Sequence, residues 1–114
     1  MKRGEIWLIS LDPTVGAEMQ KTRPAIIVND DALGLLPLRV IVPLTDWKDR
    51  YAAAAWMVKL EPDSRNRSLK PSAADCFQLR SVSQQRFVKQ IGEVSEAALK
   101  EIADALTKVL RLEE

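Results

Sequence analysis

The chain has 114 residues, of which 46% are hydrophobic and 29% charged, and its formal net charge is +1. These values predict one soluble globular domain over residues 1–114 and exclude binding of nucleic acid through overall basicity, so any such binding would need a local patch. No apolar run approaches the ~18 residues of a membrane span, and the N-terminus lacks the features of a signal peptide. A cytoplasmic protein without membrane contact is therefore expected.

The chain contains no histidine and one cysteine, Cys76. This excludes a Ser-His-Asp triad, a Cys-His pair, a histidine-based metal site and an intrachain disulfide. Carboxylates are then the only remaining metal ligands, and their spacing shows no cluster, so we expect neither a metal nor a cofactor. Any catalysis must depend on Arg, Lys, Ser, Thr, Asp or Glu, or on positioning alone.

Short stretches with turn signals between them occupy the first 93 residues. Alternating or continuous apolar patterns predict strands over six stretches, namely residues 5–11, 25–29, 38–44, 56–60, 74–82 (with Cys76 or Phe77 inward) and 87–94. Residues 30–34 and 83–86 are expected to be turns or single helical turns, and residues 46–55 either a loop or a short helix. Pro43 indicates that its strand meets a sheet edge or a bulge at that end.

The C-terminal part of the sequence predicts a helix that begins after Ser95, a favourable N-cap, with Glu96 at its positive end. One face carries an apolar stripe with helical spacing, formed by Leu99, Ile102, Ala103, Leu106, Val109 and Leu110. Several short strands and a terminal helix predict a mainly β fold, a small and strongly bent barrel or sheet with the helix packed on it. Apolar surface left over favours a dimer.

Arg23 stands where a polar loop, residues 12–22, becomes a buried strand. Pro24 restricts the backbone of Arg23 to an extended conformation. A guanidinium binds phosphate bidentately and keeps its charge at any working pH, which favours Arg23 as a phosphate ligand over an ordinary surface arginine.

Thr45 ends the strand that follows, after Val42-Pro43-Leu44. It is either a simple strand end or a partner of Arg23. If the second and third strands are neighbours, the two side chains can meet at one end of the sheet. A guanidinium and a hydroxyl converging on a phosphate would stabilise charge that develops in a transition state.

At this point the sequence resembles a known family. The blocks Arg3-Gly4-Glu5-Ile6-Trp7-Leu8, Leu11-Asp12-Pro13-Thr14-Val15-Gly16-Ala17-Glu18, Lys21-Thr22-Arg23-Pro24-Ala25, Val42-Pro43-Leu44-Thr45 and Gln78-Leu79-Arg80-Ser81-Val82 resemble, in order, the MazF/PemK toxins of bacterial toxin–antitoxin systems. The resemblance implies a small SH3-like β-barrel of the CcdB/PemK type and a homodimer. It also implies a metal-independent, sequence-specific endoribonuclease of single-stranded RNA that is inhibited by a cognate antitoxin and contacts DNA only through it.

The resemblance implies that Arg23 and Thr45 are the catalytic pair. Attack of the ribose 2′-OH on the adjacent phosphate would leave a 2′,3′-cyclic phosphate and a 5′-OH end, which suits a protein without histidine because the substrate supplies its own nucleophile. Whether Arg23 also donates a proton stays open, since its pKa lies above 12.

Further residues are candidate RNA ligands under the same resemblance. They are Thr14, Glu18, Lys21 and Thr22 in the loop, Gln78, Arg80 and Ser81 in the last block, and Trp47 as a stacking residue. Arg80 could equally be a structural ion-pair partner, and Trp47 could be a packing residue. Phe77 and Ser83 depart from the family pattern, in which an acid is common at both positions.

Two other functions remain possible for the same fold. A CcdB-like toxin binds DNA gyrase without cutting RNA, and an inactive relative could act as a co-repressor with its antitoxin. The Arg23-Pro24 and Leu44-Thr45 blocks argue against a pure binder, which needs no such pair.

Overall fold

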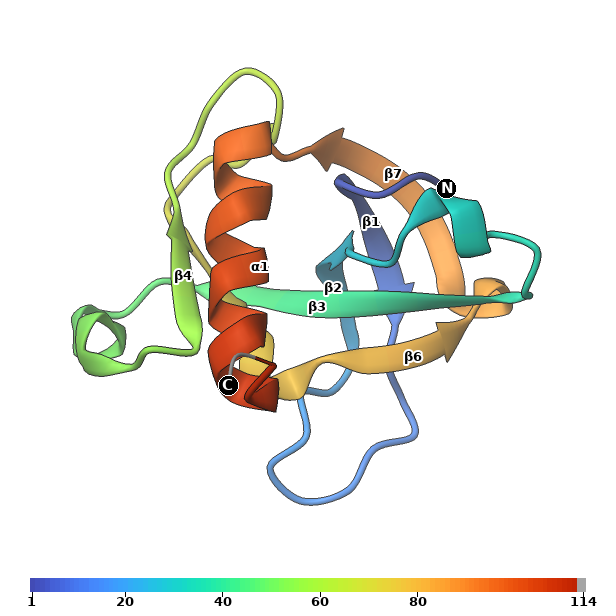
Figure 1. The fold of residues 1–114 in the computed structure, drawn as a ribbon, viewed down its shortest axis with the longest axis horizontal. Coiled ribbons are helices and arrows are strands. Elements are labelled where there is room, and N and C mark those ends of the chain that lie inside the picture. Colours follow the sequence, from blue (N-terminus) through green and yellow to red (C-terminus); the bar gives the residue numbers. More distant parts are fainter. Residues whose placement is uncertain (113–114) are drawn as a thin grey trace.

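A strongly curved antiparallel sheet with one long helix against it makes up the computed structural model, which describes residues 1–112 (Figure 1). Within these residues the sheet has seven strands, β1 (Glu5–Ser10), β2 (Thr22–Ile27), β3 (Leu38–Asp46), β4 (Met57–Leu60), β5 (Ser72–Asp75), β6 (Arg80–Ser83) and β7 (Phe87–Glu93). The helix α1 spans Glu96–Leu110. Single 3₁₀ turns are η1 (Asp31–Leu33), η2 (Asp49–Ala53), η3 (Cys76–Gln78) and η4 (Gln84–Arg86).

The strands follow the order β4-β5-β3-β2-β1-β7, with β6 paired to β3. The path does not close on itself, so "barrel" describes the curvature of the sheet rather than a closed ring. The predicted mainly β chain with a C-terminal helix is confirmed. None of the helices in residues 1–112 has the length and apolarity needed to cross a bilayer.

Strand β3 is the longest and pairs with three neighbours. It pairs with β2 along one side, while on the other side β6 pairs with its first half and β5 with its last three residues. Pro43 lies in the interval between the β6 and β5 ladders, so its missing N–H removes no bond from either. The expected irregularity at Pro43 is therefore a change of partner within a central strand.

Two core clusters lie on opposite faces of the sheet because side chains alternate along each strand. The helix-side core contains Ile26 and Val42 of the central strands and Ile102 of α1. The loop-side core consists of Ile9, Leu11, Ala25, Ile27, Ile41 and Val82. Strand β2 contributes to both, with Ile26 toward the helix and Ala25 and Ile27 toward the other face.

The helix begins where its sequence predicts, directly after Ser95. The Ser95 hydroxyl accepts a bond from the Ala98 N–H at 3.1 Å, and Arg111 ends the helix in the left-handed conformation with φ 53°. Ile102, on the apolar stripe, is 1% exposed.

The prediction of one strand over residues 74–82 is wrong. The chain forms β5, turns through η3 and then forms β6. The Asp75 carboxylate caps the turn by accepting a bond from the Phe77 N–H at 3.1 Å, and this local bond competes with the strand. Cys76 is the inward residue, whereas Phe77 is 69% exposed.

Strand boundaries also differ from the prediction, and β3 continues to Asp46, so that Thr45 lies within the strand rather than at its end. Strand β2 begins at Thr22, so Arg23 lies within the strand and is paired with Ile9 of β1. Within residues 46–55 the short-helix alternative is realised by η2.

Candidate active site

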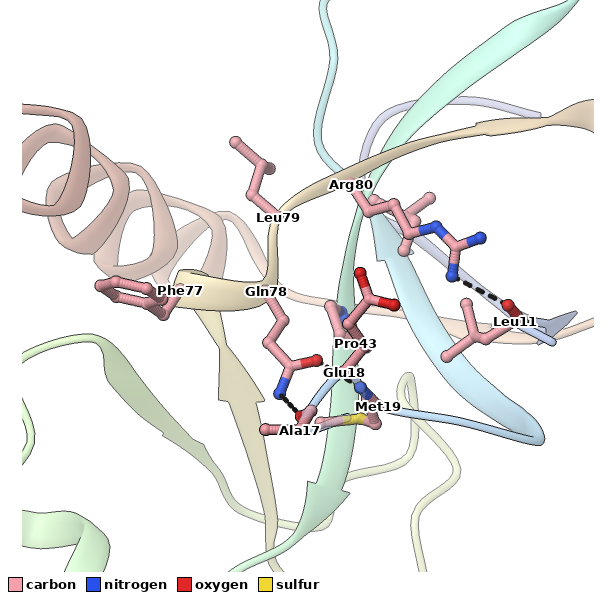
Figure 2. A pocket seen from close by; sticks show the side chains of 10 residues that line it. Leu11, Ala17, Glu18, Met19, Pro43, Phe77, Gln78, Leu79 and Arg80 are labelled. Carbon is pink, nitrogen blue, oxygen red and sulfur yellow. Dashed lines mark hydrogen bonds between the residues drawn. The ribbon is translucent and has the colours of Figure 1, made fainter. Parts of the chain in front are cut away.

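A cavity of about 350 Å³ opens on the loop-side face, between the β1–β2 loop (residues 11–21) and the segment that joins β5 to β6. Strand β3 supplies part of its wall through Ile41 and Pro43. Figure 2 shows the surrounding side chains; the lining residues are Leu11, Ala17, Glu18, Met19, Ile41, Pro43, Phe77, Gln78, Leu79 and Arg80.

Arg23 and Thr45 stand on facing strands beside this cavity. The β2–β3 ladder pairs Ile27 with Ile41 and ends at the pair Ala25 and Pro43, so Arg23 and Thr45 each lie two residues beyond its last pair, at the same end of the two strands. Alternation places both side chains on the face that carries Ala25 and Pro43. Since Pro43 lines the cavity, the two predicted catalytic residues share its side of the sheet.

The guanidinium of Arg23 is held at one point only. Its Nε donates to the Gln20 carbonyl at 2.9 Å, and among residues 1–112 its two terminal nitrogens donate to no protein acceptor. Arg23 and Thr45 are both half-buried. A guanidinium with two available donors can hold an anionic tetrahedral group bidentately.

The side chains of Arg80 and Gln78 bind the backbone of the β1–β2 loop. Arg80 Nη1 donates to the Leu11 carbonyl at 2.9 Å, and Gln78 Oε1 accepts from the Met19 N–H (Figure 2). Gln78 Nε2 also donates to the Ala17 carbonyl at 3.4 Å. Arg80 thus contacts a backbone carbonyl rather than forming an ion pair. Gln78, which the sequence predicts as a ligand of an RNA base, is hydrogen-bonded to the loop.

The loop contains three of the predicted RNA ligands, and a fourth begins β2 directly after it. Thr14 donates to the Asp12 carboxylate at 3.2 Å, and Glu18 accepts from the Val15 N–H at 2.6 Å while also lining the cavity. Lys21 is exposed and has φ 70°, and its carbonyl accepts from the Leu11 N–H at 3.0 Å. Thr22 is exposed at the first position of β2.

Of the predicted RNA ligands only Glu18, Gln78 and Arg80 line the cavity, and the two that remain to be placed lie away from it. Ser81 is exposed on β6, and alternation directs it to the face opposite Arg80 and the buried Val82. Trp47 follows β3, packs edge-on against Tyr51 at 5.8 Å between ring centroids, and lies under the Lys59 ammonium at 5.2 Å.

Two buried titratable groups lie next to each other at the start of η3. Burial raises the pKa of Asp75, although bonds from the Phe77 N–H and from Gln78 act in the opposite direction. Burial and the neighbouring Asp75 charge raise the pKa of the Cys76 thiol to about 12. Cys76 is therefore protonated at neutral pH and is no nucleophile.

Sequence reasoning missed two residues that act on this site. Arg86 Nη1 donates to the Ser10 carbonyl at 3.1 Å and to the Asp12 carbonyl at 2.6 Å, and Asp75 contacts Gln78. Neither stands out in sequence, because each acts through backbone atoms or through another side chain. Within residues 1–112 no three Asp, Glu or Cys side chains gather as they would around a metal ion.

Structures with the same fold include MazF from Deinococcus radiodurans, with a TM-score of 0.82, 21% identity and coverage of 97% of this chain and 96% of that one. Another is an endoribonuclease in complex with its cognate antitoxin from mycobacterial species, with a TM-score of 0.79, 21% identity and coverage of 100% and 98%. At this level of identity the likeness concerns the fold.

Closer sequence relatives exist. The Escherichia coli protein named endoribonuclease PemK is 35% identical over 112 residues, which cover 96% of this chain and 82% of that protein. The Mycobacterium tuberculosis protein named endoribonuclease MazF9 is 31% identical, over 93% of this chain and 92% of its own length. The family model described as PemK-like, MazF-like toxin of type II toxin–antitoxin system matches residues 2–110, and the chain belongs to that family.

Proposed function

We propose that this chain is the toxin of a type II toxin–antitoxin system and acts as an endoribonuclease on single-stranded RNA, with mRNA as its substrate. The names of its PemK and MazF9 relatives support this activity. The observation that supports the proposal is the pairing of β2 with β3, which ends at Ala25 and Pro43 and leaves Arg23 and Thr45 at the same end of the two strands, on the face where Pro43 lines a cavity.

The proposed reaction is a transesterification within the RNA. The ribose 2′-oxygen attacks the adjacent phosphorus, the bond from phosphorus to the 5′-oxygen breaks, and the products are a 2′,3′-cyclic phosphate and a 5′-OH end. The 2′-OH loses one proton and the departing 5′-oxygen gains one. Arg23 stabilises the negative charge on the non-bridging oxygens, and the Thr45 hydroxyl donates to the same group.

The RNA path follows from where the other residues lie. Thr14, Glu18 and Lys21 contact RNA from the loop and Thr22 from the start of β2, and Gln78 and Arg80 contact it from the opposite wall. Trp47 and Ser81, both away from the cavity wall, contact nucleotides outside the cleavage position. No metal or cofactor takes part in this proposal.

The proposed partners are a cognate antitoxin and a second copy of this chain. A solved endoribonuclease of the same fold is described in complex with its cognate antitoxin, which supports an antitoxin partner. We propose that an acidic-hydrophobic segment of the antitoxin covers the RNA groove, that the toxin contacts DNA only through the antitoxin, and that it acts as a homodimer in the cytoplasm.

Incubation of the purified protein with a mixed RNA in EDTA, followed by mapping of the ends, tests the function. The expected result is cleavage with cyclic phosphate and 5′-OH ends, lost in Arg23→Ala and Thr45→Ala and retained in Lys100→Ala. Lys100 is a suitable control because it is an exposed cation on α1. Intact RNA together with inhibition of DNA gyrase would overturn the proposal in favour of a CcdB-like binding toxin.

A further inference from the structure

The β1–β2 loop is fastened to the rest of the molecule mainly through its backbone. Arg80 and Arg86 bind carbonyl groups at its beginning, and Gln78 binds Met19 and Ala17 near its end. Residues 13–16, between these points, are the free part of the loop. Toward the end that leads to Arg23, the Gln78 amide holds Met19 and the Arg23 guanidinium itself holds the Gln20 carbonyl.

The amide of Gln78 has one favourable orientation in this setting. Its oxygen faces the Met19 N–H, while its nitrogen faces the Ala17 carbonyl and Asp75 Oδ2, each at 3.4 Å. Rotation of the amide by half a turn would set a donor against the Met19 N–H and an acceptor against two acceptors. Asp75 thus helps to fix which end of the amide meets the loop.

Asp75 occupies an unusual place for a carboxylate. It is 6% exposed, and charged side chains are seldom buried to this extent unless they are paired. Asp75 Oδ1 caps η3 by accepting from the Phe77 N–H, a task that a serine hydroxyl performs equally well. The second carboxylate oxygen, which faces Gln78, is what an aspartate adds at this position.

We infer that Asp75 and Gln78 form a latch that holds the β1–β2 loop over the cavity, with Asp75 as a positioning residue for the Gln78 amide. The inference rests on the proposed function for its link to RNA. Gln78 keeps its bond to the Met19 N–H when RNA enters, so that the loop stays over the cavity, and Asp75 keeps the amide oriented in both states. Loss of the latch leaves Arg23 and Thr45 on their strands and weakens closure of the loop on RNA.

Hydrogen exchange of the Met19 amide tests the latch without any RNA. The variants are Gln78→Ala, which removes the amide, and Asp75→Ser, which keeps a cap for η3 but removes the oxygen that faces Gln78. Asp30→Ser is the matched control, because Asp30 caps η1 through the Ala32 N–H at 2.9 Å, away from the loop. We expect exchange at Met19 to accelerate by about tenfold or more in the two latch variants and to stay unchanged in the control.

Steady-state cleavage of RNA tests what the latch does. In both latch variants KM is expected to rise several-fold, with the smaller change in kcat, whereas Asp30→Ser keeps both constants. Unchanged Met19 exchange in Gln78→Ala and Asp75→Ser would overturn the latch. Faster exchange with unchanged KM would overturn its role in RNA closure, and absence of cleavage by the unmodified protein would overturn the proposed function while the exchange result still decides the latch.

Discussion

The two parts of the candidate site are held in different ways. Arg23 and Thr45 lie on strands whose ladders continue into the core, whereas Thr14, Glu18 and Lys21 lie on a loop fastened by four side chains, those of Gln78, Arg80, Arg86 and Arg23. Strand positions are fixed by many backbone bonds, while a loop can open when one or two contacts are lost. The groups proposed to stabilise charge are thus preorganised, whereas the groups proposed to cover RNA lie on the part that can open.

The largest expected effect comes from changing the strand-borne arginine. Arg23→Ala should lower kcat for RNA cleavage by about 100-fold or more, because a preorganised donor to the reacting phosphate is lost. Arg23→Lys keeps the charge but not the two-pronged geometry and should recover only part of the rate. Single-turnover kinetics measure both. Full activity in Arg23→Ala would show that the strand-borne pair is not catalytic.

Truncation of a core side chain on β2, the strand that carries Arg23, should lower the stability of the fold. Ile26 lies on β2, which pairs with β1 and β3, and its side chain is fully buried. Ile26→Ala should therefore lower the free energy of unfolding by about 2–5 kcal/mol. Val88→Ala, on the exposed side of β7, is the control and should change it by less than about 0.5 kcal/mol. Urea unfolding provides the measurement. Similar values for the two variants would contradict the assigned core.

Loss of a side chain that holds the β1–β2 loop should affect the loop but not the strands that carry Arg23 and Thr45. Arg86→Ala removes two bonds to the Ser10 and Asp12 carbonyls and should cost about 1 kcal/mol, since the side chain is partly exposed. We expect faster amide exchange in residues 11–21 and a higher KM, with the rate at saturating RNA largely kept. A loss of kcat as large as that of Arg23→Ala would mean that the loop and the pair are not separable.

The smallest effect is the pH dependence contributed by Asp75. Because burial raises its pKa in the folded state, the folded protein holds this proton more tightly than the unfolded chain, and stability from this group falls as pH rises through the raised pKa. Asp75→Asn removes this term. Urea unfolding at about pH 3 and pH 7 should show the unmodified protein losing stability relative to the variant as pH rises; the opposite trend would contradict the raised pKa.

Much of this arrangement follows from local sequence signals. The β-branched run after Pro24 predicts a buried strand, and Ser95 with the apolar stripe predicts α1, although Leu110 of the stripe is 50% exposed and Ala105, outside the stripe, is buried. The resemblance of the Arg23 and Thr45 blocks to a family indicated both catalytic candidates, and the pairing of β2 with β3 leaves both at the same end of the two strands.

The parts that sequence did not predict depend on contacts between distant residues. The strand breaks at η3 because the Asp75 carboxylate caps a local turn instead of the chain continuing its strand pairing. The β1–β2 loop is held in part by Arg86, which lies 74 residues from Asp12 in the sequence. Pro43 looked like an edge residue because its neighbours were unknown, although β3 simply changes partners there. Such choices are made by tertiary packing rather than by propensity.

A double-mutant cycle on RNA cleavage tests the central claim most directly. If Arg23 and Thr45 act on one phosphate as a unit, the Arg23→Ala and Thr45→Ala double variant should lose little more rate than the worse single variant, with all three proteins unfolding at similar urea concentrations. Losses that multiply, as for two independent residues, would contradict a phosphate site that Arg23 and Thr45 share at one end of β2 and β3.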